Sequence, residues 1–257
     1  MRVERDGIAL NAHVSGDGPP VLFLHALGLD HTIWADVMGQ MPNHRLIAMD
    51  LRGHGASDAP PPAYAMGALI ADAEAVLEAA EARDAVVIGI SLGGMIAQGL
   101  AVKRLDLVRA LVLSNTAARF GQPGPWQDRA ALVQAQGMAA IEETTLTRWF
   151  GRGASGPAVD AARALLRDCD PQGYAGGCTA IAGTDFYTPT SGLRLPTLGI
   201  AGDRDGSTPP DLVRETLELI PGSDVRLMRR SGHLPCLDAP EAMAALIRDF
   251  LARIGHS

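Results

Sequence analysis

Strands and helices are expected to alternate along most of the chain, and this alternation restricts the fold more than any other feature. Short apolar runs such as "VLFL", "AVVIGI" and "PTLGI" are each followed by a segment with helical spacing. Parallel strands need a long crossover between them, and a helix usually supplies it. The pattern therefore predicts a mostly parallel sheet that is covered by helices on both faces.

One stretch of the chain breaks this alternation. Residues 119–190 contain helical patterns such as "DRAALVQAQGMAAIEETTLTRWF" and no convincing strand. A helical insertion of this size in a βα chain is typically a lid over the carboxyl ends of the strands. We therefore predict a core domain of residues 1–118 and 191–257, with residues 119–190 inserted as a helical cap. The alternative is a helical subdomain that only adds stability.

Composition excludes several classes of protein. The chain has 257 residues and a formal net charge of −7, which disfavours binding to nucleic acid. No apolar run is long enough to span a bilayer, and the charged start "MRVERDGIAL" is unlike a signal peptide. The three cysteines fit neither a disulfide framework nor a zinc pattern. We expect a cytoplasmic monomer or small homo-oligomer with no nucleic-acid or membrane partner.

The stretch "AVVIGISLGGMIAQGL" places a serine between two glycines where a strand gives way to a helix. The match Gly89-Ile-Ser91-Leu-Gly93 is short, but its position is the one that a nucleophile elbow requires. In such an elbow a tight, strained turn raises the hydroxyl above the sheet, and glycines leave room for the crossing strand and helix. We predict Ser91 as a nucleophile; the competing interpretation is a simple turn residue.

A serine hydroxyl is a poor nucleophile without a base, and an acid and a histidine should follow it in the chain. "IAGDRDGSTPP" places Asp203 and Asp205 just past a strand, and "RRSGHLPCLDAP" places His233 after the last strand. We choose Asp205 because it lies deeper in its loop, and keep Asp203 as the alternative. Turn formation by the acids and a structural histidine are the competing explanations.

Two backbone N–H groups are expected to form an oxyanion hole. Leu92 begins the helix after the serine, so its N–H points toward an incoming oxyanion. The loop "HALG" should supply the second donor, which we assign to Leu27, with Ala26 as the weaker choice. His25 and His54 precede the serine in the chain, which favours structural or site-lining work over a role as the base.

Several motifs together resemble the α/β-hydrolase superfamily across nearly the whole chain. They are "LHALGLDHTIW", "DLRGHGASD", "GISLGGMIAQ", "AGDRDGSTPP" and "SGHLPCLDAPE". The segments "VLSNTAARFG", "TRWF" and "CDPQGYAGGCTAIAGTDF" look more narrowly like the 3-oxoadipate enol-lactonases of aromatic degradation. One departure is His25, which stands where a small amide residue is expected. The resemblance implies an eight-stranded α/β-hydrolase sheet with a helical cap.

The implied reaction is the hydrolysis of 3-oxoadipate enol-lactone by a triad of Ser91, Asp205 and His233, with no metal and no organic cofactor. The substrate is a small anionic lactone, and a protein of net charge −7 needs a local cation to bind it. The alternatives are another small-ester or C–C bond hydrolase on the same scaffold, and a hydrolase-fold ligand sensor. Sustained turnover would favour an enzyme over a sensor.

The candidate substrate-binding residues are mostly in the cap. Arg148 could grip a carboxylate through two hydrogen bonds, and the neighbouring indole of Trp149 could pack on the flat ring. A solvated arginine beside a buried tryptophan is the competing explanation, and Arg52 and Arg119 are rival cations. The remaining members of the predicted substrate-binding set are Trp126 and His25.

Overall fold

The computed structural model describes residues 1–256 and contains one sheet of eight strands in the order β1-β2-β4-β3-β5-β6-β7-β8. Strands β3 to β8 pair in parallel, and β1 and β2 pair antiparallel at one edge. The strands are β1 (Arg2–Arg5), β2 (Ile8–Ser15), β3 (Pro20–Leu24), β4 (Arg45–Met49), β5 (Ala85–Ile90), β6 (Val108–Ser114), β7 (Thr197–Gly202) and β8 (Asp224–Met228).

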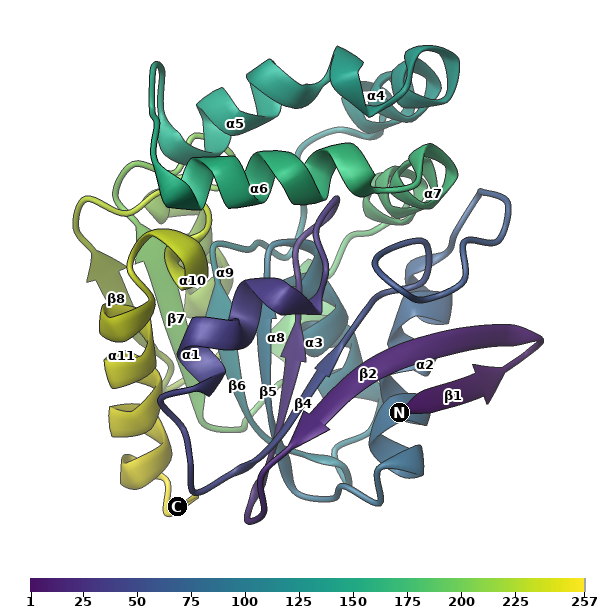
Figure 1. The fold of residues 1–257 in the computed structure, drawn as a ribbon. Coiled ribbons are helices and arrows are strands. Elements are labelled where there is room, and N and C mark those ends of the chain that lie inside the picture. The colour runs from purple at the N-terminus through teal and green to yellow at the C-terminus, as the bar shows by residue number, and fades with distance from the viewer. Residues whose placement is uncertain (257) are drawn as a thin grey trace.

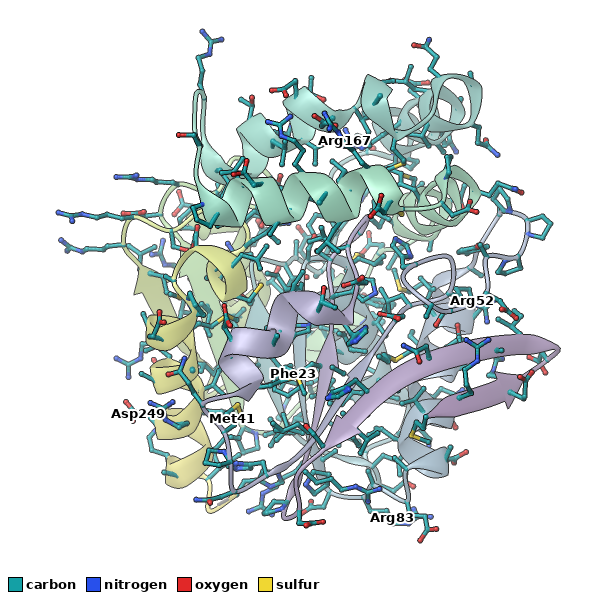
Figure 2. All side chains as sticks on the ribbon, viewed as in Figure 1. Phe23, Met41, Arg52, Arg83, Arg167 and Asp249 are labelled. Carbon is teal, nitrogen blue, oxygen red and sulfur yellow. The ribbon has the colours of Figure 1, made fainter. Side chains whose placement is uncertain are left out.

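The centre of the sheet is its most apolar part, because both faces there are covered. Every residue of β5 and of β7 is buried, and Phe23 on β3, labelled in Figure 2, is fully buried. Strands covered on both sides read as continuous apolar runs rather than as alternating ones. The parallel register brings the carboxyl ends of the central strands to one edge of the sheet, where β3, β5, β6 and β7 all end.

Two groups of helices cover the sheet (Figure 1). Helices α1 and α11 pack together on one face, and α2 and α3 pack together on the other. The helices of the core are α1 (Ala35–Met38), α2 (Met66–Ala79), α3 (Leu92–Lys103), α9 (Pro210–Glu218), α10 (Pro235–Asp238) and α11 (Pro240–Arg253). Asp30 caps the single 3₁₀ turn that precedes α1, accepting a hydrogen bond from Thr32 N.

Residues 119–190, the cap segment, form only helices and lie between β6 and β7 in the chain. The helices are α4 (Pro123–Gln136), α5 (Glu142–Phe150), α6 (Pro157–Asp168), α7 (Pro171–Ala182) and α8 (Tyr187–Ser191). Figure 1 shows α4 to α7 above the carboxyl ends of the strands. The last helix, α8, instead contacts α3. Division into two domains stays a prediction, although the cap segment covers the strand ends as a lid would.

The predicted fold class is confirmed, with one addition at the N-terminus. The charged start of the chain, which sequence patterns do not mark as a strand, forms β1 and pairs with β2. An edge strand with one partner leaves alternate side chains in solvent, so Arg2 and Glu4 are exposed while Val3 is buried. Within residues 1–256 no helix is long and apolar enough to cross a membrane.

Candidate active site

Ser91 lies in a sharp turn between β5 and α3, with backbone angles of φ 55° and ψ −117°. A positive φ is costly for a residue with a Cβ, and such strain of about 1–3 kcal/mol persists only where the surroundings fix it. Here Ser91 N donates to Ser114 O, and the hydroxyl of Thr116 donates to Ser91 O at 2.6 Å. The serine is therefore held where strand ends meet.

The glycines around Ser91 are required by close contacts between main chains. A Cβ on Gly89 would lie 2.3 Å from Gly93 O, and a Cβ on Gly93 would lie 2.2 Å from Leu24 O. Both distances are far inside van der Waals contact, and the atoms met are backbone, so the neighbours cannot move aside cheaply. The Gly-x-Ser-x-Gly pattern thus lets α3 begin directly against the sheet.

The structure places Asp205 on His233, with Asp205 Oδ2 2.8 Å from His233 Nδ1. Both side chains are buried. The hydroxyl of Thr208 and Asn115 Nδ2 also donate to Oδ2, at 2.5 and 2.8 Å, and the N–H groups of Ser207 and Thr208 donate to Oδ1. Burial would raise the pKa of Asp205, but the facing His233 and these donors outweigh burial and lower it.

Asp203, the alternative acid, points elsewhere. It is exposed, and its Oδ1 accepts a hydrogen bond from Arg230 N at 2.7 Å. That bond closes a turn between the loops after β7 and β8, which is the structural work that aspartate often does. Of the two acids, Asp205 alone contacts the histidine.

Two residues that sequence reasoning missed hold this pair in place. Asn115 directly follows β6 and also donates to Gly232 O at 3.1 Å, so it joins the acid to the histidine loop. Asp238, at the end of α10, accepts from Ser231 Oγ and Gly232 N. Asn115 is a polar residue directly after the strand that neighbours the one before Ser91, and this position could have marked it in the sequence. No local pattern marks Asp238.

The last turn of α5 in the cap segment is hydrogen-bonded to the two loops that carry Asp205 and His233. Arg148 O accepts from Gly206 N at 2.9 Å, and Trp149 O accepts from His233 N at 2.7 Å. The final carbonyls of a helix have no partner within it, so they are free to accept from outside. The ring of Trp149 also stacks on the ring of His233, with centroids 6.0 Å apart and planes within 16°.

Ser91 and His233 line one cavity, whose volume is about 550 Å³ with the open solvent at its mouth included. The core contributes Leu27, Ser91, Ser207 and His233. The cap segment contributes Phe120, Trp126, Arg129, Thr145, Arg148, Trp149, Tyr174 and Ile181. The cap segment thus forms the larger part of the wall around the serine.

Leu27 and Leu92, the predicted oxyanion donors, come from two different segments of the core. Leu27 lines the cavity from the loop after β3, and Leu92 is the first residue of α3. Within the described residues neither N–H has a protein acceptor, whereas the next N–H on the loop, Gly28, is bonded to His54. Ala26, the weaker choice, does not line the cavity.

Arg129 is a charged residue of the cavity wall that sequence patterns do not mark. Its Nε donates to the hydroxyl of Tyr174 at 2.7 Å, its Nη2 donates to Thr145 Oγ1, and its guanidinium lies 5.6 Å from the Tyr174 ring centroid. Among residues 1–256 it forms no ion pair with a carboxylate, in contrast to Arg163 and Arg167, which both pair with Glu142. A half-buried cation with neutral partners is available to an anion.

The other predicted substrate-binding residues divide into two groups. Arg148, Trp149 and Trp126 all line the cavity, and the indole of Trp126 is fixed by donating to Phe120 O at 2.7 Å. Arg148 is largely exposed and has no carboxylate partner in the part of the chain that the structure describes. These three stay candidates for contact with a substrate.

The rival arginines and His25 lie outside the cavity. Arg52, labelled in Figure 2, is paired with the buried carboxylate of Asp72, and Arg119 is paired with Asp185. The prediction that His25 touches substrate is wrong, because the side chain is fully buried and both ring nitrogens contact the main chain. Backbone partners of this kind cannot be read from sequence.

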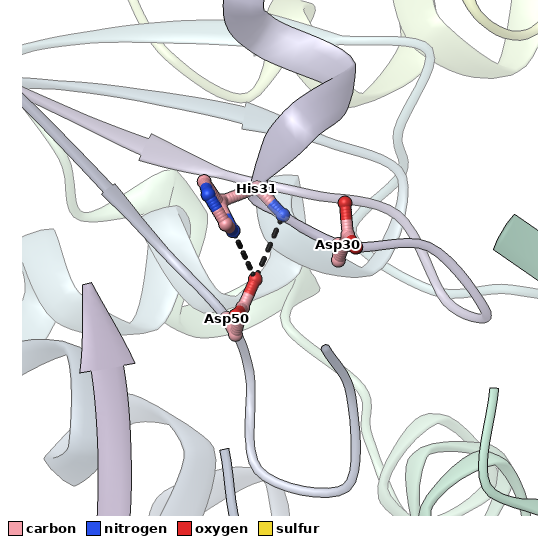
Figure 3. A group of neighbouring side chains, drawn as sticks. All are labelled: Asp30, His31 and Asp50. Carbon is pink, nitrogen blue, oxygen red and sulfur yellow. Dashed lines mark hydrogen bonds and ion pairs between the residues drawn. The ribbon is translucent and has the colours of Figure 1, made fainter. Parts of the chain in front are cut away.

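One cluster has the donor types of a metal site. Ligand atoms of Asp30, His31 and Asp50 lie within 4.8 Å of one another (Figure 3). The oxygens of Asp50 already accept from His31 N, His31 Nδ1, Asn11 Nδ2 and Ala56 N at 2.7 to 2.9 Å. These hydrogen bonds explain the cluster as a structural contact between the loops that follow β3 and β4.

A model of the alpha/beta hydrolase family matches residues 21–246, so the chain belongs to this family, as its motifs indicated. A 3-oxoadipate enol-lactonase of Acinetobacter baylyi is 32% identical over 232 residues, which cover 85% of this chain and 87% of the relative. A pimeloyl-[acyl-carrier protein] methyl ester esterase of Vibrio cholerae is 27% identical, with 96% and 99% covered.

The solved structures include a close match in shape. The crystal structure of the enol-lactonase from Burkholderia xenovorans LB400 is 28% identical, with a TM-score of 0.94 and coverage of 98% of this chain and 100% of that one. The chain is therefore an α/β hydrolase whose relatives cleave carboxylic esters, and the predicted resemblance to enol-lactonases is confirmed.

Proposed function

We propose that the protein hydrolyses a small anionic enol-lactone, 3-oxoadipate enol-lactone being the leading candidate. The observation that carries the proposal is that Arg129 and Arg148, which form no ion pair within residues 1–256, line the same cavity as Ser91 and His233. The cations indicate a substrate with a carboxylate, and the enol-lactonase relatives indicate the ring. The assignment of the triad is part of the same proposal.

The reaction begins with attack of Ser91 Oγ on the ring carbonyl. His233 Nε2 takes the hydroxyl proton, because Nδ1 is bonded to the carboxylate of Asp205 and keeps its own proton. The lowered pKa of Asp205 keeps this acid ionised, so it stabilises the imidazolium that forms. A tetrahedral intermediate results, with negative charge on the former carbonyl oxygen.

The N–H groups of Leu27 and Leu92 receive that charge. Removing one donor of this kind costs about 2.7–4 kcal/mol of transition-state stabilisation in other enzymes. Collapse of the intermediate breaks the bond to the ring oxygen, which leaves as an enol after taking the proton from His233. The enol becomes a ketone, which makes the step hard to reverse. Water, deprotonated by His233, then releases the acyl group from Ser91 as a second carboxylate.

Arg129 is positioned to recognise the side-chain carboxylate of the substrate. Its Nε and Nη2 are held by Tyr174 and Thr145, which fixes the guanidinium without neutralising it. Arg148 stands at the exposed end of α5 and supplies a second positive charge. Together they offset the unfavourable field of a chain with a net charge of −7.

The test compares two lactones that differ only in charge. One is the enol-lactone with its carboxymethyl group, and the other is the same ring with a methyl group in that place. Ring opening is followed by the loss of ultraviolet absorbance. We expect kcat/KM to be about 10- to 100-fold higher for the anionic lactone, since a charged hydrogen bond in a partly buried site contributes about 1.5–3 kcal/mol.

Equal values for the two lactones would contradict the assigned substrate while leaving the hydrolase intact. Ser91→Ala is the control for the chemistry and should be inactive on both. The second candidate function is that of a methyl ester esterase, which the relative from Vibrio cholerae favours because the match covers nearly all of both chains. Faster cleavage of methyl esters of short dicarboxylic acids than of either lactone would select it.

A further inference from the structure

We propose that His25 and His54 are positioning residues of the oxyanion site, each fixing one of the two successive peptide planes that meet at Leu27. The proposal rests on the proposed function, because it assigns a purpose to the Leu27 N–H. It follows from the hydrogen bonds between two loops, residues 25–31 after β3 and residues 50–58 after β4, which we call the paired loops.

His25 fixes the first peptide plane. Its Nδ1 lies 2.8 Å from Ala26 O, and its Nε2 accepts from Leu51 N at 2.9 Å. Since Leu51 N is a donor, Nε2 must be the unprotonated nitrogen, and Nδ1 carries the proton that is given to Ala26 O. Ala26 O and Leu27 N belong to one planar trans peptide and point in opposite directions. Holding the oxygen therefore aims the N–H.

His54 fixes the second peptide plane in the same manner from the other loop. Its Nε2 accepts from Gly28 N at 3.0 Å, and its Nδ1 lies 3.1 Å from Arg52 O. The Gly28 N–H shares a peptide with the carbonyl of Leu27, so both planes that flank the Leu27 Cα are held. Gly28 has φ +83°, which frees the chain to turn there.

The two histidines act reciprocally. Each lies on one of the paired loops and accepts a hydrogen bond from the main chain of the other loop, with ring centroids 5.2 Å apart. The hydrogen bonds from His31 to Asp50 in Figure 3 join the last residue of the first loop to the first residue of the second. A fixed donor needs no reorganisation when charge develops on the substrate, and this is the main source of oxyanion stabilisation.

The surroundings keep both imidazoles neutral. Burial lowers the pKa of His25, and burial with the neighbouring His25 lowers the pKa of His54 to about 3. Asp50 raises the pKa of both rings and Asp30 raises that of His25, whereas the neighbouring His31 lowers the pKa of His25 further. A neutral imidazole can accept through Nε2 and donate through Nδ1 at the same time, whereas a protonated one can only donate.

The test uses asparagine and glutamine at both positions. The amide of asparagine reaches the place of Nδ1, and the amide of glutamine reaches the place of Nε2. At residue 54 the essential bond is accepted by Nε2, so His54→Gln should keep kcat within about fivefold while His54→Asn loses about 10- to 100-fold. At residue 25 the essential bond is donated by Nδ1, so His25→Asn should be the better variant and His25→Gln the worse.

This reversal of rank between the two positions separates positioning from general stability. KM should change by less than about threefold in all four variants, and the affinity for a trifluoromethyl ketone that forms a tetrahedral adduct with Ser91 should fall in step with kcat. A common rank order at both positions, or losses that follow the unfolding temperature, would overturn the proposal. Retained activity of Ser91→Ala would instead contradict the proposed function. A failure of the proposed function can therefore be told apart from a failure of the positioning role of the histidines.

A measurement on the unaltered protein covers the case in which the variants do not fold. Nitrogen-15 chemical shifts of the imidazoles report which ring nitrogen carries the proton. We expect the Nδ1–H form for both His25 and His54 at pH 7. An Nε2–H form at either residue, or a charged ring, would overturn the proposal directly.

Discussion

Asp205 and Arg129 are two charged side chains of one site, and hydrogen bonds hold them from different parts of the chain. The partners of Asp205 come from the ends of separate strands: Asn115 follows β6, Thr208 follows β7 and His233 follows β8. The two residues that hold Arg129 belong to the cap segment, Thr145 on α5 and Tyr174 on α7.

The two sets of partners differ in which part of the structure would have to change to move each side chain. Moving Asp205 would require a change in the sheet, which sets the positions of all the loops that touch it. Moving Arg129 would require a change only within the cap segment. Under the proposed function, chemistry is carried out at the sheet edge and the substrate is recognised by the insertion, so one core could serve both an enol-lactone and a methyl ester.

The cap segment is nevertheless not independent of the core. The glycines of α7 allow close packing on the paired loops: a Cβ on Gly173 would lie 1.9 Å from Gly53 O, and one on Gly177 would lie 2.4 Å from Leu27 Cδ1. On the other side, α5 accepts hydrogen bonds from the loops that carry Asp205 and His233. The cap segment and the core loops of the site are thus fixed relative to each other at two places.

The largest expected effect tests whether chemistry belongs to the core. Ser91→Ala should lower kcat by about 10⁵-fold or more, because loss of the nucleophile removes the covalent route. The unfolding temperature should stay the same or rise, since alanine makes no new contact at the turn. Retention of more than a few per cent of kcat would reject Ser91 as the nucleophile.

Asp205→Asn should come next, with a loss of about 10³- to 10⁴-fold in kcat and little change in KM. The amide can present an N–H to His233 Nδ1 and stabilise the wrong tautomer, as happens in other triads. Asp203→Asn is the matched control, because the same substitution is made two residues away on an exposed side chain. A larger loss at residue 203 than at residue 205 would reverse the assignment of the acid.

Arg129→Gln tests the charged side chain that the cap segment holds in the cavity. It should raise KM for the anionic lactone by about 10- to 100-fold and leave kcat/KM for the methyl-substituted ring nearly unchanged, because only the anion needs the charge. Arg148→Gln should have a smaller effect, of about two- to fivefold, since that side chain is exposed and its charge is screened. Equal effects on both lactones would mean that neither arginine binds the carboxylate.

The core was predictable from the sequence because its signals are local. The apolar run before Ser91, the glycines beside it and the acid and histidine after later strands are each legible within about ten residues, and parallel pairing then brings them to one edge. Arg129 was not predictable, because its hydroxyl partner on Tyr174 is 45 residues away. Helical spacing does not say which face of α4 meets the cavity.

His25 was misassigned for a related reason. A histidine in a loop beside the nucleophile has the same sequence signature whether it faces the substrate or the main chain. The deciding contact is Leu51 N, 26 residues away on another loop. Backbone acceptors and donors carry no side-chain identity, so a sequence cannot display this partner, and only the fold does.

The pH dependence of stability extends the comparison to the paired loops. The pKa of His54 is lowered from 6.5 to about 3 in the folded chain, so between those values the unfolded chain binds a proton that the folded chain does not. The unfolding free energy must therefore decrease as the pH falls through this window, by about 2 kcal/mol from His54 alone between pH 7 and pH 5. Urea unfolding of the unaltered protein and of His54→Gln measures the difference, because glutamine does not titrate and other groups contribute equally to both. The curves should lie parallel above pH 7 and approach each other below it, whereas a constant gap down to pH 5 would show that His54 is not kept neutral by its burial between the paired loops.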